Sequence, residues 1–451
     1  MSLTWTLVTL AVIGGLAYHR APLWLWSALG LLALGVAMYC AALATGAQVV
    51  LWSAFGALAL LLNVPLLRRQ LVTRPVFALF RRILPAMSDT EREALEAGTV
   101  WWEAELFNGA PRWEKLFAVS KAQLSPTEQK FLDGPVEELC RKIDDWDITH
   151  NRRDLPPEVW QYLKDNGFFG MIIPKKYGGL EFSALAHSAV VMKVSSRSVS
   201  VGVTVMVPNS LGPAELLLHY GTDAQKNHYL PRLARGREVP CFALTGPEAG
   251  SDAASIPDRG VVCRGEFEGK KDVLGIRLNW EKRYITLGPV ATVLGLAFQL
   301  YDPDHVLGAQ EDLGITLALI PTTTPGVKIG SRHNPLNSAF QNGPNWGHDV
   351  FIPMDWIIGG RDCIGQGWRM LMDCLAAGRS ISLPAQATSA GKHAARFVGA
   401  YARIRKQFKV PIGRFEAIEE ALSRIGGYTY LMDAARVFTA RAVDLGEKPA
   451  V

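Results

Sequence analysis

Two stretches of this chain carry residue types that suit close contact with a bound ligand. The first, 241–256, reads CFALTGPEAGSDAASI, and the second, 282–298, reads KRYITLGPVATVLGLAF. Small residues in the first stretch leave space beside the backbone and expose N–H groups, which suits a pyrophosphate or the edge of an isoalloxazine ring; they are Gly246, Gly250 and Ser251. Thr245 adds a directed hydroxyl at a predicted strand end. A Gly/Ser/Asp run alone is typical of a turn, so the interpretation as a binding site depends on both stretches together.

An apolar region precedes a larger region of ordinary globular composition. Hydrophobic residues make up 49% of the 451 residues, which is high for a wholly soluble protein. Between Leu3 and Leu67 the chain has no charged or histidine side chain except those of His19 and Arg20. We expect transmembrane helices there, in two or three apolar segments that together occupy residues 1–67. The segments are about 3–18, which is marginal in length, and 22–44 and 48–67, which can each span roughly 30 Å of hydrocarbon.

A cleaved signal peptide is the competing interpretation of residues 1–18. No basic segment precedes that apolar stretch and no convincing small-residue cleavage site follows it, so we expect a retained span. Basic residues follow the first and the third apolar segments, and with three spans both clusters lie on the same side of the membrane, as the positive-inside rule requires. They are Arg20 and then Arg68, Arg69, Arg74, Arg81 and Arg82. The large domain is therefore predicted to be cytoplasmic.

The charge distribution indicates a membrane surface as a partner rather than nucleic acid. The formal net charge is +5, and no basic and aromatic stripe recurs after the 68–82 cluster. That cluster suits either a stop-transfer flank or a helix lying on anionic lipid. The six cysteines form no C-x-x-C pair and the histidines form no cluster at metal spacing. Neither a disulfide framework nor a metal site is predicted.

After the apolar region, the sequence pattern that predicts secondary structure changes three times. Residues 68–130 form a basic juxtamembrane segment and a polar connector, in which Ser88 and Glu91 have capping-box spacing. Helical periodicity interrupted by Gly and Pro then predicts a helical domain. After it, β-branched residues that alternate with polar ones predict antiparallel strands. A helical pattern returns at the end of the chain. The predicted bounds are 131–238 for the helical domain, 239–362 for the β domain and 363–451 for a partial helical domain.

Five ordered motifs of the region from about 131 to 451 resemble those of the acyl-CoA dehydrogenases. They are IPKKYGGLEFS, HYGTDAQKNHYLPRLARGREVP, CFALTGPEAGSD, KRYITLG and YARIRKQFKVPIGRFEAI. With its apolar N-terminal segments, the chain is similar to the bacterial FadE-type long-chain enzymes in particular. The resemblance implies the family's fold of a helical domain, a β domain and a C-terminal helical bundle, with FAD as cofactor.

Four residues acquire roles through this resemblance. It implies that Thr245 hydrogen-bonds the flavin and that Ser251 contacts the flavin phosphate and the pantetheine arm of the substrate. Tyr284 would lie against the isoalloxazine, where the family usually has Trp, and Thr286 would lie near flavin N5. Tyr and Thr also favour strands, so ordinary strand positions are the alternative for Tyr284 and Thr286. Gly246, where the family usually has Glu, is a further departure that could alter the flavin's properties.

Three more residues match family positions later in the chain. Arg405 and Phe408 match the family's R-x-Q-F, whose arginine reaches the FAD diphosphate of a neighbouring subunit, as a planar guanidinium can. Arg379 matches the arginine near the thioester end of the acyl-CoA pocket, which makes Ser251 and Arg379 the expected substrate contacts. The resemblance thereby also implies a homo-oligomer.

The implied reaction removes two hydrogens across Cα–Cβ of a fatty acyl-CoA. A carboxylate shielded from water takes the α-proton, and flavin N5 accepts the hydride. The family's usual glutamate lies in a Y-E-G-T-like segment that does not occur before Val451, and its less common position is Gly378 here. No catalytic base is therefore assigned. We expect a truncated copy, whose two last helices leave the four-helix bundle incomplete.

The predicted protein is an inner-membrane acyl-CoA dehydrogenase with its catalytic domain on the cytoplasmic side. The resemblance implies dehydrogenation of medium- or long-chain acyl-CoA to trans-2-enoyl-CoA, the first step of fatty acid β-oxidation, with electrons passed to an electron-transfer flavoprotein. Two alternatives stay open: a non-catalytic membrane protein that binds acyl-CoA or flavin, and an acyl-CoA oxidase-like flavoenzyme. An acyl-CoA oxidase passes its electrons to oxygen, whereas the main prediction passes them to an electron-transfer flavoprotein. The identity of the electron acceptor therefore distinguishes the two.

Overall fold

The chain folds into two compact units, Met1–Ser88 and Asp89–Val451. The structure is a computed structural model, and it describes residues 3–41, 44–88, 91–92, 95–96, 101–107, 109–210 and 212–447. The helix predicted to start at the Ser88 capping box falls largely outside these residues.

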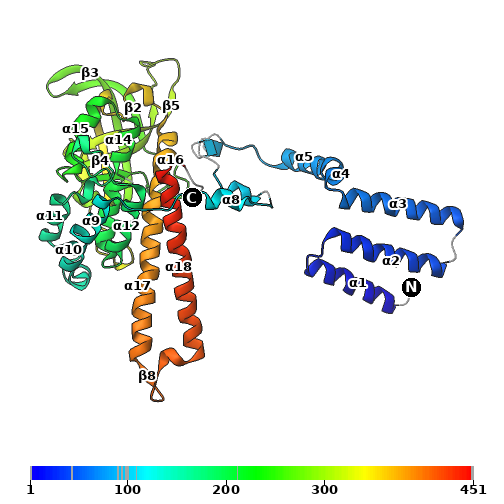
Figure 1. The fold of residues 1–451 in the computed structure, drawn as a ribbon. Helices are drawn as coiled ribbons and strands as arrows, with labels where there is room; N and C mark the ends of the chain where they lie inside the picture. Colours follow the sequence, from blue (N-terminus) through cyan, green and yellow to red (C-terminus); the bar gives the residue numbers. More distant parts are fainter. Residues whose placement is uncertain are drawn as a thin grey trace. The chain divides into compact units, whose positions relative to one another are not determined.

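Three apolar helices make up most of the first unit. They are α1 (Leu3–Tyr18), α2 (Leu23–Ala41) and α3 (Thr45–Asn63), and they lie side by side with successive helices running in opposite directions (Figure 1). The Asn63 Nδ2 donates a hydrogen bond of 2.7 Å to Ser27 Oγ, which joins α3 to α2. The stretches Leu23–Cys40 and Thr45–Asn63 are long and apolar enough to cross a membrane, whereas α1 has only 16 residues.

The first unit continues with a short helical segment rich in arginine. It consists of α4 (Pro65–Arg68), the π-helical turn η1 (Arg69–Thr73) and α5 (Arg74–Ile83). The guanidinium of Arg68 donates through Nη1 to the Leu62 carbonyl at 3.2 Å, so it covers an otherwise unpaired carbonyl near the end of α3.

Helices form the first part of the second unit, as predicted. The capping box of Ser125 and Glu128 starts α9, because the Glu128 N–H donates to Ser125 Oγ at 3.3 Å and the Ser125 N–H donates to Glu128 Oε2 at 2.7 Å. Another long apolar stretch, Val199–Tyr220, is 88% buried inside this unit. The α-helices are α7 (Ala104–Phe107), α8 (Trp113–Phe117), α9 (Pro126–Asp133), α10 (Pro135–Lys142), α11 (Pro157–Asp165), α12 (Ala184–Ser195), α13 (Val199–Met206), α14 (Pro213–Tyr220) and α15 (Asp223–Ala234).

A seven-stranded sheet follows, in the order β1-β4-β2-β3-β7-β6 with β5 paired to the other side of β4. The prediction of antiparallel strands is wrong for two pairs, because β1 and β2 both run parallel to β4. Side-chain alternation reports which strand face is buried but not the direction of the neighbouring strand. The strands are β1 (Pro240–Ala243), β2 (Arg259–Phe267), β3 (Lys270–Thr286), β4 (Val293–Tyr301), β5 (Asp312–Pro321), β6 (Val327–Ile329) and β7 (Asn342–Pro353).

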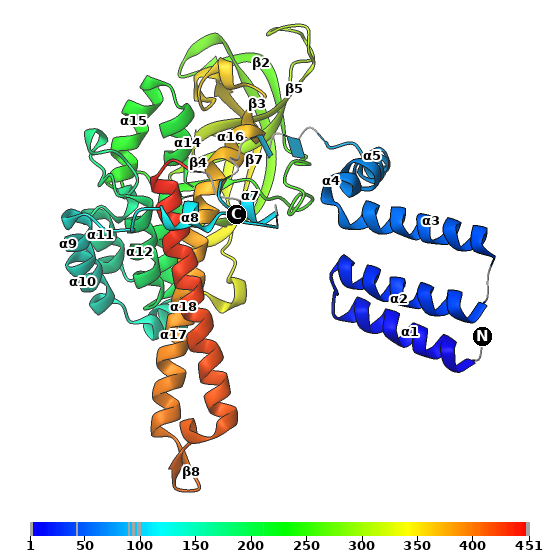
Figure 2. The same ribbon diagram turned by 45° about the vertical axis from the view of Figure 1, so that its right-hand side comes forward.

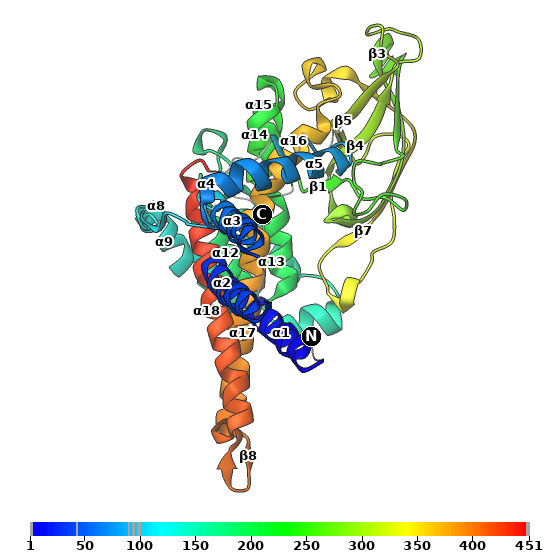
Figure 3. The same cartoon turned by 90° about the vertical axis from the view of Figure 1, so that its right-hand side faces the viewer.

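The chain then returns to helices. The π-helical turn η10 (Gly378–Ser382) joins α16 to α17, and α17 and α18 run side by side with the β8–β9 hairpin at their tip (Figures 2 and 3). Both helices also contact α12, where the Arg436 Nη1 donates to Ser188 Oγ at 3.0 Å. The elements are α16 (Gly367–Ala377), α17 (Leu383–Ile404), β8 (Lys406–Gln407), β9 (Val410–Pro411) and α18 (Glu416–Asp444).

Candidate functional site

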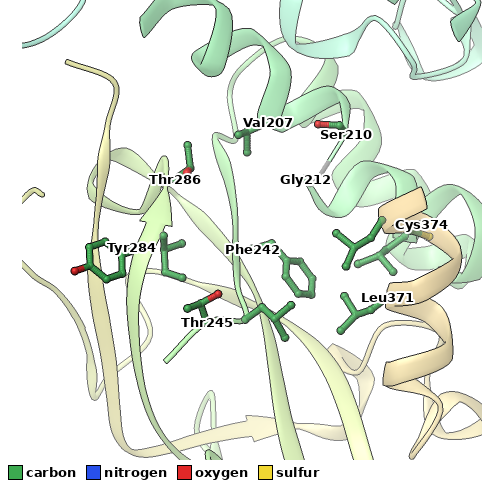
Figure 4. A pocket seen from close by; sticks show the side chains of 13 residues that line it. Val207, Ser210, Gly212, Phe242, Thr245, Tyr284, Thr286, Leu371 and Cys374 are labelled. Atoms are coloured by element: carbon green, nitrogen blue, oxygen red, sulfur yellow. The ribbon is translucent and has the colours of Figure 1, made fainter. Parts of the chain in front are cut away.

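A cavity of about 200 Å³ lies where the ends of two strands meet helical segments (Figure 4). Three residues predicted from the sequence line it together: Thr245 follows β1, and Tyr284 and Thr286 end β3. Apolar side chains form most of the remaining wall; they include Val207, Leu216, Phe242, Ile285, Leu371 and Leu375. The cavity is smaller than the roughly 300 to 1,000 Å³ typical of small-molecule pockets, so it suits the reactive part of a larger ligand.

A buried ion pair fixes the segment that carries Thr245. The Lys282 ammonium pairs with the Asp258 carboxylate and also donates a hydrogen bond of 2.7 Å to the carbonyl of Leu244. The Glu281 N–H donates to Asp258 Oδ1 at 2.9 Å. Burial lowers the pKa of Lys282, and the charge of Asp258 opposes that shift. The backbone just before Thr245 is therefore tied to β3 by a charged side chain in the protein interior.

Close backbone contact continues into the turn after Thr245. The Arg283 N–H donates to the Thr245 carbonyl at 3.0 Å. A Cβ added to Gly246 would lie 2.9 Å from the Glu281 carbonyl oxygen, closer than side-chain carbons normally approach. The glycine at this position is thus required by the approach of the turn to β3, and the glutamate usual in the family would need the backbone to shift.

One asparagine holds the other side of the cavity. The Asn342 Nδ2 donates to the Tyr284 carbonyl at 2.9 Å and to Thr286 Oγ1 at 3.3 Å. Tyr284 has a φ of +59°, in the left-handed region that non-glycine residues rarely adopt. Its side chain is 55% exposed, and its ring centroid lies 4.7 Å from that of His333.

Tyr284 contributes to the rim of the cavity more than to its interior. Figure 4 shows its hydroxyl pointing away from Leu371 and Cys374. The backbone of Tyr284 is held by Asn342.

The other predicted site residues do not line this cavity. Ser251 is exposed in the turn after β1, and Arg379 is exposed in η10. Arg405 and Phe408 are exposed beside the β8–β9 hairpin, with 90% of Phe408 accessible. The 22 residues of α17 make it about 33 Å long, and the hairpin lies at the end of this helix.

Ser210, Leu371 and Cys374 also line the cavity, and none of them was predicted from the sequence. On α16 the residues 371, 374 and 375 have the i, i+3, i+4 spacing of one helix face, which could have indicated a buried wall. No local signal marks Ser210, whose hydroxyl donates to the Met206 carbonyl at 2.7 Å. Its position depends on how distant segments pack.

No carboxylate is among the described residues that line the cavity. Asp373 is next to Cys374 in the sequence, but its Oδ2 accepts a hydrogen bond of 2.8 Å from the Tyr220 hydroxyl. Burial, together with this bond to Asp373, raises the pKa of Tyr220. The structure therefore supplies binding groups at the cavity without an evident proton acceptor.

The lining residues fit the flavin that the sequence resemblance implies. The Thr245 side chain makes no hydrogen bond to any part of the chain that the structure describes. A free hydroxyl and a largely apolar wall match a planar heterocycle with a polar edge.

Two segments of the chain match domains of a known family. Residues 126–237 match the acyl-CoA dehydrogenase N-terminal domain, and residues 241–341 match the acyl-CoA dehydrogenase middle domain. Protein HemX of Proteus mirabilis is 57% identical over 104 residues, which are 23% of this chain and 61% of that protein. The probable acyl-CoA dehydrogenase FadE10 of Mycobacterium tuberculosis is 30% identical over 303 residues, which are 67% of this chain and 44% of that protein.

A solved structure agrees with this assignment at the level of the fold. Butyryl-CoA dehydrogenase from Megasphaera elsdenii matches with a TM-score of 0.63 and 22% identity, over 73% of this chain and 82% of that one. The chain spans less than two thirds of the length of either curated relative. Residues 126–237 and 241–341 thus match the N-terminal and middle domains of the acyl-CoA dehydrogenases.

Proposed function

We propose that this chain acts in the FAD-dependent α,β-dehydrogenation of medium- or long-chain acyl-CoA to trans-2-enoyl-CoA, the first step of fatty acid β-oxidation. The observation that carries the proposal is the meeting of Thr245 and Thr286, from two strands of the middle domain, in one largely apolar cavity. The names of FadE10 and of butyryl-CoA dehydrogenase support an acyl-CoA as the substrate class.

The residues of the cavity have separable roles in this proposal. A bound flavin supplies the hydride acceptor. The hydroxyls of Thr245 and Thr286 orient its polar edge, with Thr286 itself oriented by Asn342. Phe242 and Leu371 exclude water from the reacting carbons. Ser251 and Arg379 keep their proposed contacts with the substrate, and both are exposed on the surface where a long ligand can reach them.

A membrane location is the second part of the proposal. The length and apolarity of Leu23–Cys40 and Thr45–Asn63 support two membrane spans. Arg20 and the arginines of residues 68–82 flank this pair on the same side, which favours a bacterial inner membrane with the catalytic unit on the cytoplasmic side. An electron-transfer flavoprotein would then accept electrons from the flavin on that side.

A homo-oligomer is the third part. Arg405 lies beside a hairpin at the end of a 22-residue helix and does not line this chain's own cavity. A second copy of the chain could bring Arg405 and Phe408 to the FAD diphosphate. The exposure of both side chains is consistent with such a contact.

One observation favours a second candidate function, the binding of acyl-CoA and flavin without turnover. The described lining of the cavity contains no carboxylate to take the α-proton. In this case the protein would bind its ligands and change their spectrum without dehydrogenation.

A flavin titration tests the part that both candidates share. The detergent-solubilised 451-residue chain, stripped of ligands, should quench FAD fluorescence with a saturable, stoichiometric end point. A chain that carries both Thr245→Val and Thr286→Val should bind FAD far more weakly. Equal binding by the two proteins would exclude this cavity as the flavin site.

A further inference from the structure

Helix α5, Arg74–Ile83, separates apolar and basic side chains onto opposite faces. At 100° per residue, one face carries the apolar residues and the other carries the arginines. The apolar face consists of Val76, Phe77, Phe80 and Ile83, and the basic face consists of Arg74, Arg81 and Arg82.

The apolar face is left uncovered by the residues of the first unit that the structure describes. The exposed fractions of its side chains are 48% for Val76, 63% for Phe77, 60% for Phe80 and 69% for Ile83. Most of the stability of a helix in a protein comes from the packing of its apolar face. Something that accepts an apolar face must therefore stabilise this helix.

The surrounding charge indicates what the cover is. Residues 1–88 contain no Asp or Glu, so no acidic side chain of this unit can pair with the arginines. The helix follows α3 after only the ten residues 64–73, which begin with Val64. If α3 crosses a membrane, α5 begins at the surface of that membrane, next to lipid phosphates.

We propose that α5 lies flat in the headgroup region of an anionic bilayer. Phe77 and Phe80 enter the boundary of the acyl chains, and Arg81 and Arg82 bind lipid phosphates. The inference rests on the proposed membrane insertion of α2 and α3. It gives the basic segment a specific ligand class, the anionic lipid headgroup, and fixes the point where the chain leaves the membrane.

Hydrogen–deuterium exchange of the full chain in lipid nanodiscs tests this inference. Nanodiscs of phosphatidylcholine alone provide a neutral surface. Nanodiscs that also contain about 30% phosphatidylglycerol provide an anionic surface. The amides of α5 should be protected in the anionic discs and exchange rapidly in the neutral ones. Equal protection in both lipids would overturn the proposal, since it would indicate cover by protein, such as a second copy.

Amide exchange in α2 and α3 distinguishes a failure of this inference from a failure of the proposed insertion of these two helices into the membrane. If the amides of both helices are protected in both lipids while α5 exchanges freely in both, insertion holds and the α5 inference is wrong. Free exchange of α2 and α3 would instead remove the membrane proposal itself.

Charge and apolarity are tested with two pairs of substitutions. Arg81→Gln with Arg82→Gln should lower the protection of α5 in anionic discs by about 30-fold, because each arginine near an anionic surface contributes roughly fivefold. The matched control, Arg396→Gln with Arg403→Gln, removes two exposed arginines from α17 and should leave it unchanged. Phe77→Ser with Phe80→Ser should abolish the protection even though every arginine is kept; retained protection would contradict a lipid-embedded face.

Discussion

Lys282 and Asp258 form an ion pair that is sealed from solvent, with side-chain exposures of 0% and 2%. The same ammonium donates to the Leu244 carbonyl at 2.7 Å, one residue before Thr245. The pair thereby connects the two sequence stretches that predicted the site. It acts on the cavity through the backbone and is not part of the lining.

Replacement of Lys282 by Met should lower the free energy of unfolding of the second unit by about 3 to 5 kcal/mol, because it leaves the Asp258 charge buried and unpaired. Chemical denaturation followed by tryptophan fluorescence measures this. The double variant Lys282→Met, Asp258→Asn should recover part of the loss. A single variant no less stable than the double variant would contradict the importance of the pair.

Thr245→Val and Thr286→Val should each weaken FAD binding by about tenfold, which corresponds to one hydrogen bond of about 1.4 kcal/mol. The Thr286 change should have the additional effect of leaving Asn342 Nδ2 with one partner fewer. Fluorescence titration gives the dissociation constants. Thr127→Val, at an exposed position on α9, is the control and should bind FAD like the original chain.

Arg405→Ala should cause loss of FAD while the helix content by circular dichroism is kept, because the guanidinium is exposed beside the hairpin. Arg403→Ala, two residues earlier in the last turn of α17, is the matched control. Flavin retained by the Arg405 variant would remove the proposed role across subunits.

Acidification should destabilise the second unit through His187. Burial lowers the pKa of His187 from 6.5 to about 4, so the unfolded chain binds the proton more readily than the folded one. The free energy of unfolding should therefore fall as the pH drops from about 6.5 to about 4, by up to about 3 kcal/mol.

Denaturation midpoints of the original chain and of His187→Gln, measured at intervals from pH 7 to pH 4, test this linkage. The variant lacks the imidazole and should lose less stability than the original chain over that interval. Parallel curves for the two proteins would show that His187 does not contribute.

Much of the fold could be predicted because it is encoded locally. The helical and β domains are confirmed, and the sequence at Ser125 and Glu128 forms the capping box that it suggests. The parallel pairing of β1 with β4 could not be predicted, since the β2–β3 hairpin lies between them in the sequence and alternation carries no direction.

The site was predictable only in part, because some of its residues are brought together by tertiary packing and not by local sequence. Thr245, Tyr284 and Thr286 lie in two motifs, and the structure brings them to one cavity. Ser210 and Cys374 are more than 160 residues apart and meet through tertiary packing, which no short pattern records. The left-handed backbone of Tyr284 also depends on a bulge between β3 and β7, and no glycine marks it.

The most direct test of the proposed reaction is the visible spectrum of the FAD-loaded 451-residue chain before and after anaerobic addition of palmitoyl-CoA. Dehydrogenation predicts that the yellow flavin is bleached as it takes up the hydride and that enoyl-CoA appears in equal amount. A spectral shift without bleaching would contradict turnover by this chain and support binding alone.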